Sequence, residues 1–229
     1  MKPSSTIESR LRERAGRLRD PKTVADILGQ PFILAGGAMR PAEPRDYDIF
    51  GCDRPIDLAE VERRCRERTG TGVVVLATTH NAVTVECKGQ ELQFCKHFKP
   101  TAWGLVDSFD FSHVQAGVVF DGEGRIANVA YTSAFENVEV YHATPCYITS
   151  EYPLSSLARL VKFERRGDFL PRDSDDDFIA QILAIFCDVV KRGFTSEEDF
   201  NSQCAAISSA LGDIDPTELY DLLKKGGVS

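Results

Sequence analysis

Two short stretches decide the fold of this chain: FILAGGAMR at residues 32–40 and RDYDIF at residues 45–50. In the first, an apolar run typical of a buried strand ends in a glycine pair. In the second, Asp46 and Asp48 alternate with apolar residues. Side chains along a strand repeat with a period of two, so we expect both carboxylates on one face and the apolar side chains between them in the core.

The two stretches together are typical of a metal and phosphate site. Adjacent carboxylates repel each other, and a divalent cation such as Mg²⁺ or Mn²⁺ turns that repulsion into binding, because hard cations prefer oxygen ligands and bridge to phosphates. Gly36 and Gly37 carry no Cβ, so their backbone N–H groups can approach phosphate oxygens closely. The sequence therefore predicts a metal held by Asp46 and Asp48, and a triphosphate at the glycine turn. The alternative is a solvated edge strand beside an unrelated turn.

Composition limits the class of protein. The chain has 229 residues, of which 42% are hydrophobic and 27% charged, as in an ordinary globular protein. No apolar run approaches the ~20 residues of a membrane span, and the first residues lack a secretory signal. Seven scattered cysteines without a C-x-x-C pair argue against a disulfide scaffold and a zinc cluster. We expect a cytoplasmic protein with no membrane partner, and the oligomeric state stays open.

The pattern along the chain predicts an α+β fold. Helices are expected at 6–19, 22–29 and from Asp57, then at 154–166, 175–192, 196–210 and 215–225. Strands are expected at 32–35, 46–50, 73–77, 82–86, 91–96, 114–120 and 125–131. A small mixed sheet flanked by helices is thus followed by a short all-α part. We expect a catalytic domain over residues 1–150 and a small helical domain over residues 151–229.

A third acid is expected near the first two. In the strand 91–95, Glu91 and Gln93 share one face, while Leu92 and Phe94 share the other. Metal-assisted phosphoryl transfer commonly uses a carboxylate from a neighbouring strand, which makes Glu91 the candidate. Alternatively, Glu91 is only a polar residue at the top of a hairpin.

Four motifs in order resemble one enzyme family. The glycine pair, the Asp46–Asp48 pair and the acidic strand resemble the nucleotidyltransferase fold of the DNA polymerase beta superfamily. The segment DFSHVQA at residues 110–116 resembles the Arg-Arg-Asp-Phe-Thr-Ile-Asn-Ala motif of bacterial-type tRNA CCA-adding enzymes and poly(A) polymerases. The segment 153–163 is similar to the helix that begins their neck region. The family's acid after the glycine turn is replaced here by Pro41, and its paired arginines by Ser108 and Phe109.

The resemblance implies a metal-dependent nucleotidyltransferase. Such an enzyme transfers NMP from an NTP such as ATP to a hydroxyl with release of pyrophosphate, and an RNA or tRNA 3′ end is the acceptor that the family implies. The implied metal and catalytic residues are Asp46, Asp48 and Glu91. The expected nucleotide-binding residues are Gly36, Gly37, Arg40, Asp110, Arg159 and Lys162. Alternatives are transfer to a small molecule or a protein, as in antibiotic-modifying or toxin-like relatives, and a catalytically idle nucleotide-binding protein.

Three further interpretations concern side chains around this site. Asp110 either orients the sugar or base, or caps the next segment structurally. Arg159 and Lys162 belong to a basic stripe, with spacings of three and four, that suits phosphates. The arginines between Arg10 and Arg19 are expected to be solvated around their helix, and Trp103 and the cysteines are expected to pack inside the protein.

Overall fold

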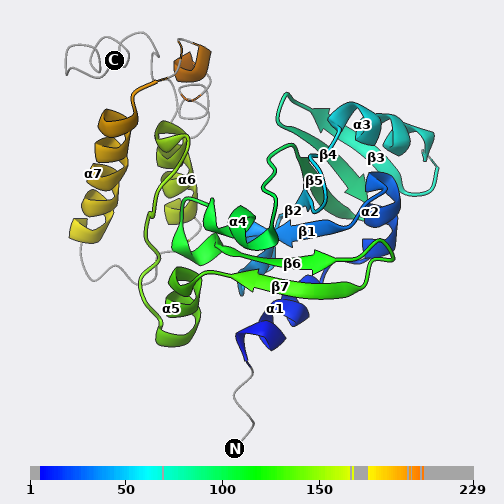
Figure 1. The fold of residues 1–229 in the computed structure, drawn as a ribbon, viewed down its shortest axis with the longest axis horizontal. Helices are drawn as coiled ribbons and strands as arrows, with labels where there is room; N and C mark the ends of the chain where they lie inside the picture. The colour runs from blue at the N-terminus through cyan, green and yellow to red at the C-terminus, as the bar shows by residue number, and fades with distance from the viewer. Residues whose placement is uncertain are drawn as a thin grey trace, which may run out of the picture. The chain divides into compact units, whose positions relative to one another are not determined.

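The structure, a computed structural model, describes residues 6–68, 70–165, 167, 175–194, 196, 198–201 and 203, with the side chains of 175–179 excluded. It divides into two compact units, Met1–Ala143 and Thr144–Ser229, each shown in Figure 1. The division predicted near residue 150 stays a prediction.

A seven-stranded mixed sheet forms the centre of the first unit (Figure 1), in the order β3-β4-β5-β2-β1-β6-β7. Its strands are β1 (Phe32–Ala35), β2 (Asp46–Gly51), β3 (Val73–Thr78), β4 (Ala82–Cys87), β5 (Gln90–Cys95), β6 (Ala116–Phe120) and β7 (Ile126–Tyr131). Neighbouring strands pair antiparallel except β2 and β5, which are parallel. The α+β fold expected from the sequence is therefore confirmed.

Helices with capped N-termini supply the core on one face of the sheet. They are α1 (Ile7–Ala15), α2 (Pro21–Leu28) and α3 (Leu58–Glu67). The side chains of Thr6, Asp20 and Asp57 accept hydrogen bonds from the first-turn N–H groups, which fixes where each helix begins. Buried side chains of these helices pack with the inward residues of the strands in one hydrophobic cluster. Within it, Phe32 stacks on Phe120 with ring centroids 4.7 Å apart.

The opposite face of the sheet is partly covered by α4 (Ala102–Asp107), which packs against β6 and β7 (Figure 1). Leu105 and Val106 of α4 join Ile33 and Phe50 of the sheet in a second apolar cluster. The first unit ends with α5 (Ser133–Tyr141), and its 3₁₀ segments are η1 (Gly36–Met39) and η2 (Ser112–Val114). The sheet thus has one face packed on helices and one that is only partly filled.

The second unit contains α6 (Pro153–Arg165) and α7 (Asp175–Arg192), which pack against each other. Its core includes the fully buried Leu154, Leu160 and Ile185. The Tyr147 hydroxyl donates to Asp188 at 2.8 Å, which ties the segment before α6 to α7. No helix in the described part of the chain is both long and apolar enough to cross a membrane.

Several expectations differ from the structure. The strand predicted at 114–120 begins at Ala116, because the preceding residues form η2. Trp103 is 57% exposed on α4, and Cys146 and Cys187 are exposed, so their predicted packing inside the protein is wrong. The helices α4 and α5 are not among those predicted. Of the helices predicted at 196–210 and 215–225, residues 198–201 and 203 are helical, residue 196 is not, and the rest lie outside the described residues.

Candidate active site

Strands β2 and β5 bring the three predicted acids to one face of the sheet. Asp46 and Asp48 are half-buried, while Tyr47 between them and Ile49 after them are buried, as the period of two predicts. The parallel register pairs Asp46 with Glu91 and Asp48 with Gln93. Register partners in adjacent strands project from the same face, so Glu91 is the neighbour of Asp46 across the strands.

The glycine turn adjoins the same carboxylates. Ala35, the last residue of β1, pairs with Asp48, so the chain enters η1 directly beside it. Gly36 has a φ of +68°, and a Cβ there would lie only 3.2 Å from Asp48 Oδ2. A Cβ on Gly37 would meet no heavy atom of the described residues within 4 Å. The turn therefore approaches a carboxylate on one side and opens to space on the other.

The pKa of the Cys95 thiol depends on the negative charges at this site. Burial raises its pKa well above the usual value, and the negative charges of Asp48 and Asp46 raise it further. Cys95 lies on the same strand face as Glu91 and Gln93. The two carboxylates are thus close enough to the same partly buried thiol for both charges to act on it.

The donor set suits a hard divalent cation. Three carboxylates on neighbouring strands supply only oxygen ligands, which Mg²⁺ and Mn²⁺ prefer. Among the residues that the structure describes, no three His, Cys, Asp or Glu side chains stand close enough to enclose a metal ion. Asp46, Asp48 and Glu91 as metal ligands therefore remain predictions, which are supported by strand register and donor chemistry.

Arg40 and the buried His113 lie near each other, where η1 meets η2. His113 is 6% exposed. Burial and, to a smaller extent, the positive charge of Arg40 together lower its pKa to about 3. His113 is therefore neutral near pH 7, and sequence reasoning missed it, although it belongs to the segment 110–116. The contact of Arg40 with a triphosphate stays a prediction.

The remaining predicted residues lie at two places. Asp110 is buried between α4 and η2, in a loop held by Gln115, whose Nε2 donates to Phe109 O at 2.7 Å. A buried carboxylate there suits either interpretation of Asp110, so both stay open. Arg159 and Lys162 are exposed on α6 in the second unit, and their role in nucleotide binding stays a prediction.

The arginines before the sheet correct the sequence interpretation. Arg14 is buried and Arg17 is half-buried, so a fully solvated helix is wrong for both. Both side chains donate to backbone carbonyls, Arg14 to that of Met39 at the end of η1 and Arg17 to those of residues 40–42 in the link to β2. Helical spacing could not reveal these partners, because they lie about 25 residues downstream.

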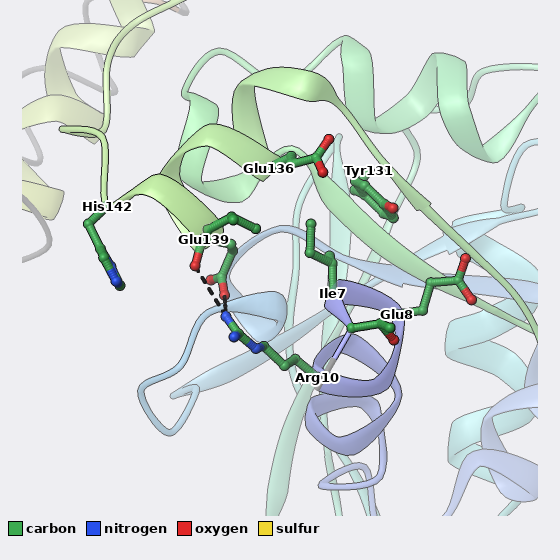
Figure 2. A pocket seen from close by; sticks show the side chains of 9 residues that line it. Ile7, Glu8, Arg10, Tyr131, Glu136, Glu139 and His142 are labelled. Carbon is green, nitrogen blue, oxygen red and sulfur yellow. Dashed lines mark hydrogen bonds and ion pairs between the residues drawn. The ribbon is translucent and has the colours of Figure 1, made fainter. Parts of the chain in front are cut away.

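A separate cavity of about 630 Å³ lies in the first unit between α1, β7 and α5 (Figure 2). Figure 2 shows Arg10 reaching Glu139 across it, with Glu8 and Glu136 on its walls. It is lined by Thr6, Ile7, Glu8, Arg10, Tyr131, Glu136, Glu139, Val140 and His142, and none of the predicted site residues borders it.

Comparisons with known proteins give no match to any family model and none to the curated proteins. Solved structures do resemble the chain. A tRNA-processing enzyme in an apo form is 15% identical over 97% of this chain and 58% of its own, with a TM-score of 0.47. The Thermotoga maritima CCA-adding enzyme complexed with tRNA is 12% identical over 95% and 54%, with a TM-score of 0.48. A CCA-adding enzyme complexed with CTP is 14% identical over 96% and 54%, with a TM-score of 0.49.

Two of these three structures are CCA-adding enzymes. The chain spans less than two thirds of the length of each solved chain.

Proposed function

We propose that this chain is a metal-dependent nucleotidyltransferase that transfers NMP from an NTP to a hydroxyl acceptor. One observation carries the proposal: the positive-φ turn at Gly36 lies against the Asp48 carboxylate, with open space at Gly37. A backbone turn that can cradle phosphates thus adjoins carboxylates that can hold a divalent cation. The Asp46–Glu91 register adds a third acid from the parallel strand.

In this mechanism Asp46 and Asp48 would hold Mg²⁺, with Glu91 as a third ligand. The ion would supply charge neutralisation of the triphosphate and polarisation of the α-phosphoryl group. The amides of Gly36 and Gly37 bind phosphate oxygens, and Arg40 offsets their negative charge. The acceptor oxygen forms a bond to the α-phosphorus, the bond to the β-phosphate oxygen breaks, and pyrophosphate leaves. Glu91 takes the proton of the acceptor hydroxyl.

Catalysis of this kind depends on positioning and electrostatics more than on covalent chemistry. Rigid placement therefore matters, and the site is built on two central strands of the sheet. The inward residues of β2 are buried in the core, so the two carboxylates are held on a stiff support.

The acceptor we propose is an RNA 3′ hydroxyl, with tRNA as the first candidate. The proposal is supported by the resemblance of the segment 110–116 to the CCA-adding enzyme motif. It is also supported by the exposed Arg159 and Lys162 on α6, which can contact phosphates of RNA or of the NTP. Asp110 would orient the sugar or base of the nucleotide.

The test uses NTPs labelled at either the α- or the γ-phosphate. The protein is incubated with Mg²⁺ and each NTP in turn, together with tRNA transcripts lacking the 3′ CCA, total RNA, or a protein and metabolite extract. We expect α-label on RNA, γ-label in the released pyrophosphate but on no acceptor, and loss of transfer with EDTA or in the D46N/D48N variant. Label on protein or a small molecule would favour the alternative acceptors. Silence with every acceptor would favour an idle nucleotide-binding protein.

A further inference from the structure

The link between the glycine turn and β2 has few internal hydrogen bonds available. It reads RPAEPR at residues 40–45, and its two prolines carry no N–H group. This link must set the position of the turn relative to the strand that carries Asp46. Its backbone carbonyls therefore need donors from elsewhere in the protein.

Arg14 supplies a donor at the residue just before the link. Its Nη1 donates to Met39 O at 2.5 Å, at the last residue of η1. The same guanidinium forms a two-pronged pair with Glu139 of α5, with both contacts at 2.8 Å. Each side chain of this pair is only 9% exposed. The planar guanidinium thus has one fixed orientation, which a flexible surface pair would lack.

Arg17 supplies donors for the next three carbonyls. Its Nη1 donates to Arg40 O at 3.4 Å and to Ala42 O at 3.0 Å, and its Nη2 donates to Pro41 O at 3.0 Å. The carbonyls of four consecutive residues, 39 to 42, are therefore bound by two arginines.

The backbone of Arg17 is itself anchored to the two site strands. Its carbonyl accepts from Gln90 Nε2 at 2.8 Å and from the Tyr47 hydroxyl at 3.4 Å. Gln90 Nε2 also donates to the Tyr47 oxygen at 2.9 Å. Tyr47 lies between the two aspartates, and Gln90 precedes Glu91. One arginine therefore connects the link to both acid-bearing strands.

We infer that Arg14 and Arg17 are positioning residues for nucleotidyl transfer, which hold the glycine turn at a fixed distance from the carboxylates of β2. The catalytic part of this inference rests on the proposed function. Neither side chain needs to touch the substrate. They act through the carbonyls of residues 39–42, and a displaced turn would misalign the triphosphate with the acids.

The experiment compares four variants of the full chain. R17A removes three carbonyl contacts, and R17K keeps the charge but not the fork that spans them. R14M/E139M removes the buried pair without leaving one charge uncompensated. R12A is the matched control, because Arg12 is an exposed arginine of α1, the helix that carries Arg14 and ends shortly before Arg17. Hydrogen exchange of the amides at residues 36–45 and steady-state transfer kinetics are measured for each.

We expect faster exchange over residues 36–45 in R17A, R17K and R14M/E139M, with thermal midpoints in R17A and R17K close to that of the unchanged protein. We also expect kcat/KM for the NTP to fall about 10- to 100-fold in all three. R12A should behave as the unchanged protein does.

Unchanged exchange over residues 36–45 would overturn the inference, as would unchanged kcat/KM in a protein that is active. Exchange and kcat/KM in R17K equal to those of the unchanged protein would also overturn it, because the positive charge alone would then suffice. If the unchanged protein transfers no nucleotide, the proposed function fails on its own, and the exchange measurement still decides whether the two arginines hold the turn.

Discussion

Replacing Gly36 with alanine should disturb both stability and activity. Gly36 has a φ of +68°, a left-handed conformation that costs a residue with a Cβ roughly 1–2 kcal/mol. The new methyl carbon would lie 3.2 Å from Asp48 Oδ2, closer than ordinary van der Waals contact. The carboxylate must therefore move by a few tenths of an ångström. We expect G36A to lower the free energy of unfolding by about 1–2 kcal/mol and kcat about 10-fold or more.

The matched control is G37A. The neighbouring glycine lacks a positive φ, and a Cβ there would meet no heavy atom of the described residues within 4 Å. Alanine should leave the free energy of unfolding unchanged or raise it by up to about 1 kcal/mol. Because that Cβ would occupy the open side of the turn, KM for the NTP should rise.

For both variants, urea unfolding followed by circular dichroism measures the free energy of unfolding, and transfer of α-label from the NTP measures kcat and KM. The reasoning is refuted if G36A is as stable and as active as the unchanged protein. It is also refuted if G37A leaves KM unaltered, since the turn would then make no phosphate contact.

Three further perturbations separate charge, burial and protonation. D48N should lower kcat by about 100-fold or more while the chain stays folded. In D48N the pKa of the Cys95 thiol should also fall, so alkylation of Cys95 at fixed pH should be faster than in the unchanged protein. An unchanged alkylation rate would contradict the inference that the Asp48 charge raises this pKa. R14A should lower the free energy of unfolding in urea by about 3 kcal/mol, because the buried Glu139 carboxylate loses its close partner and keeps the more distant Arg10. The double variant R14M/E139M should lower the free energy of unfolding much less, because it removes both buried charges. Burial lowers the pKa of His113 to about 3 in the folded chain, so only the unfolded chain gains its proton as pH falls below about 6.5. Stability should therefore drop by about 2 kcal/mol between pH 7 and 5, and H113N should show a shallower pH dependence of the urea midpoint.

The parts of the site that depend on local periodicity were predictable from the sequence. Alternation alone places Asp46 and Asp48 on one face and Tyr47 in the core, and the structure confirms this arrangement. The glycine pair similarly predicts a turn at the end of β1. The chemistry of a third acid predicts that the strand of Glu91 neighbours β2, but the parallel direction and register of β2 and β5 were not predictable, because α3, β3 and β4 separate the two strands and no local pattern states their direction.

Side chains whose partners are distant in the chain were the hardest to interpret. Arg14 and Arg17 lie on an arginine-rich segment without a single basic face, so solvation was the simpler interpretation. Their contacts depend on carbonyls of a proline-containing link that only the folded chain brings near. Trp103 was missed for a different reason: α4 has only six residues, too few to show which of its apolar side chains face the sheet.

The position of Glu91 beside Asp46 depends on the apolar residues that follow it. Leu92 and Phe94 are almost fully buried on the helix-covered face, and they alternate with Glu91 and Gln93. A slip of one residue would place Glu91 in the core and the apolar side chains in solvent, which is strongly unfavourable because the carboxylate would lose its hydration. A slip of two residues would keep the faces but would either carry Glu91 past the end of β2 or pair it with Asp48. The parallel direction also matters, because an antiparallel partner would bring Glu91 beside Phe50 instead. The core of β5 thus fixes the third acid at the strand end where the first aspartate and the glycine turn lie.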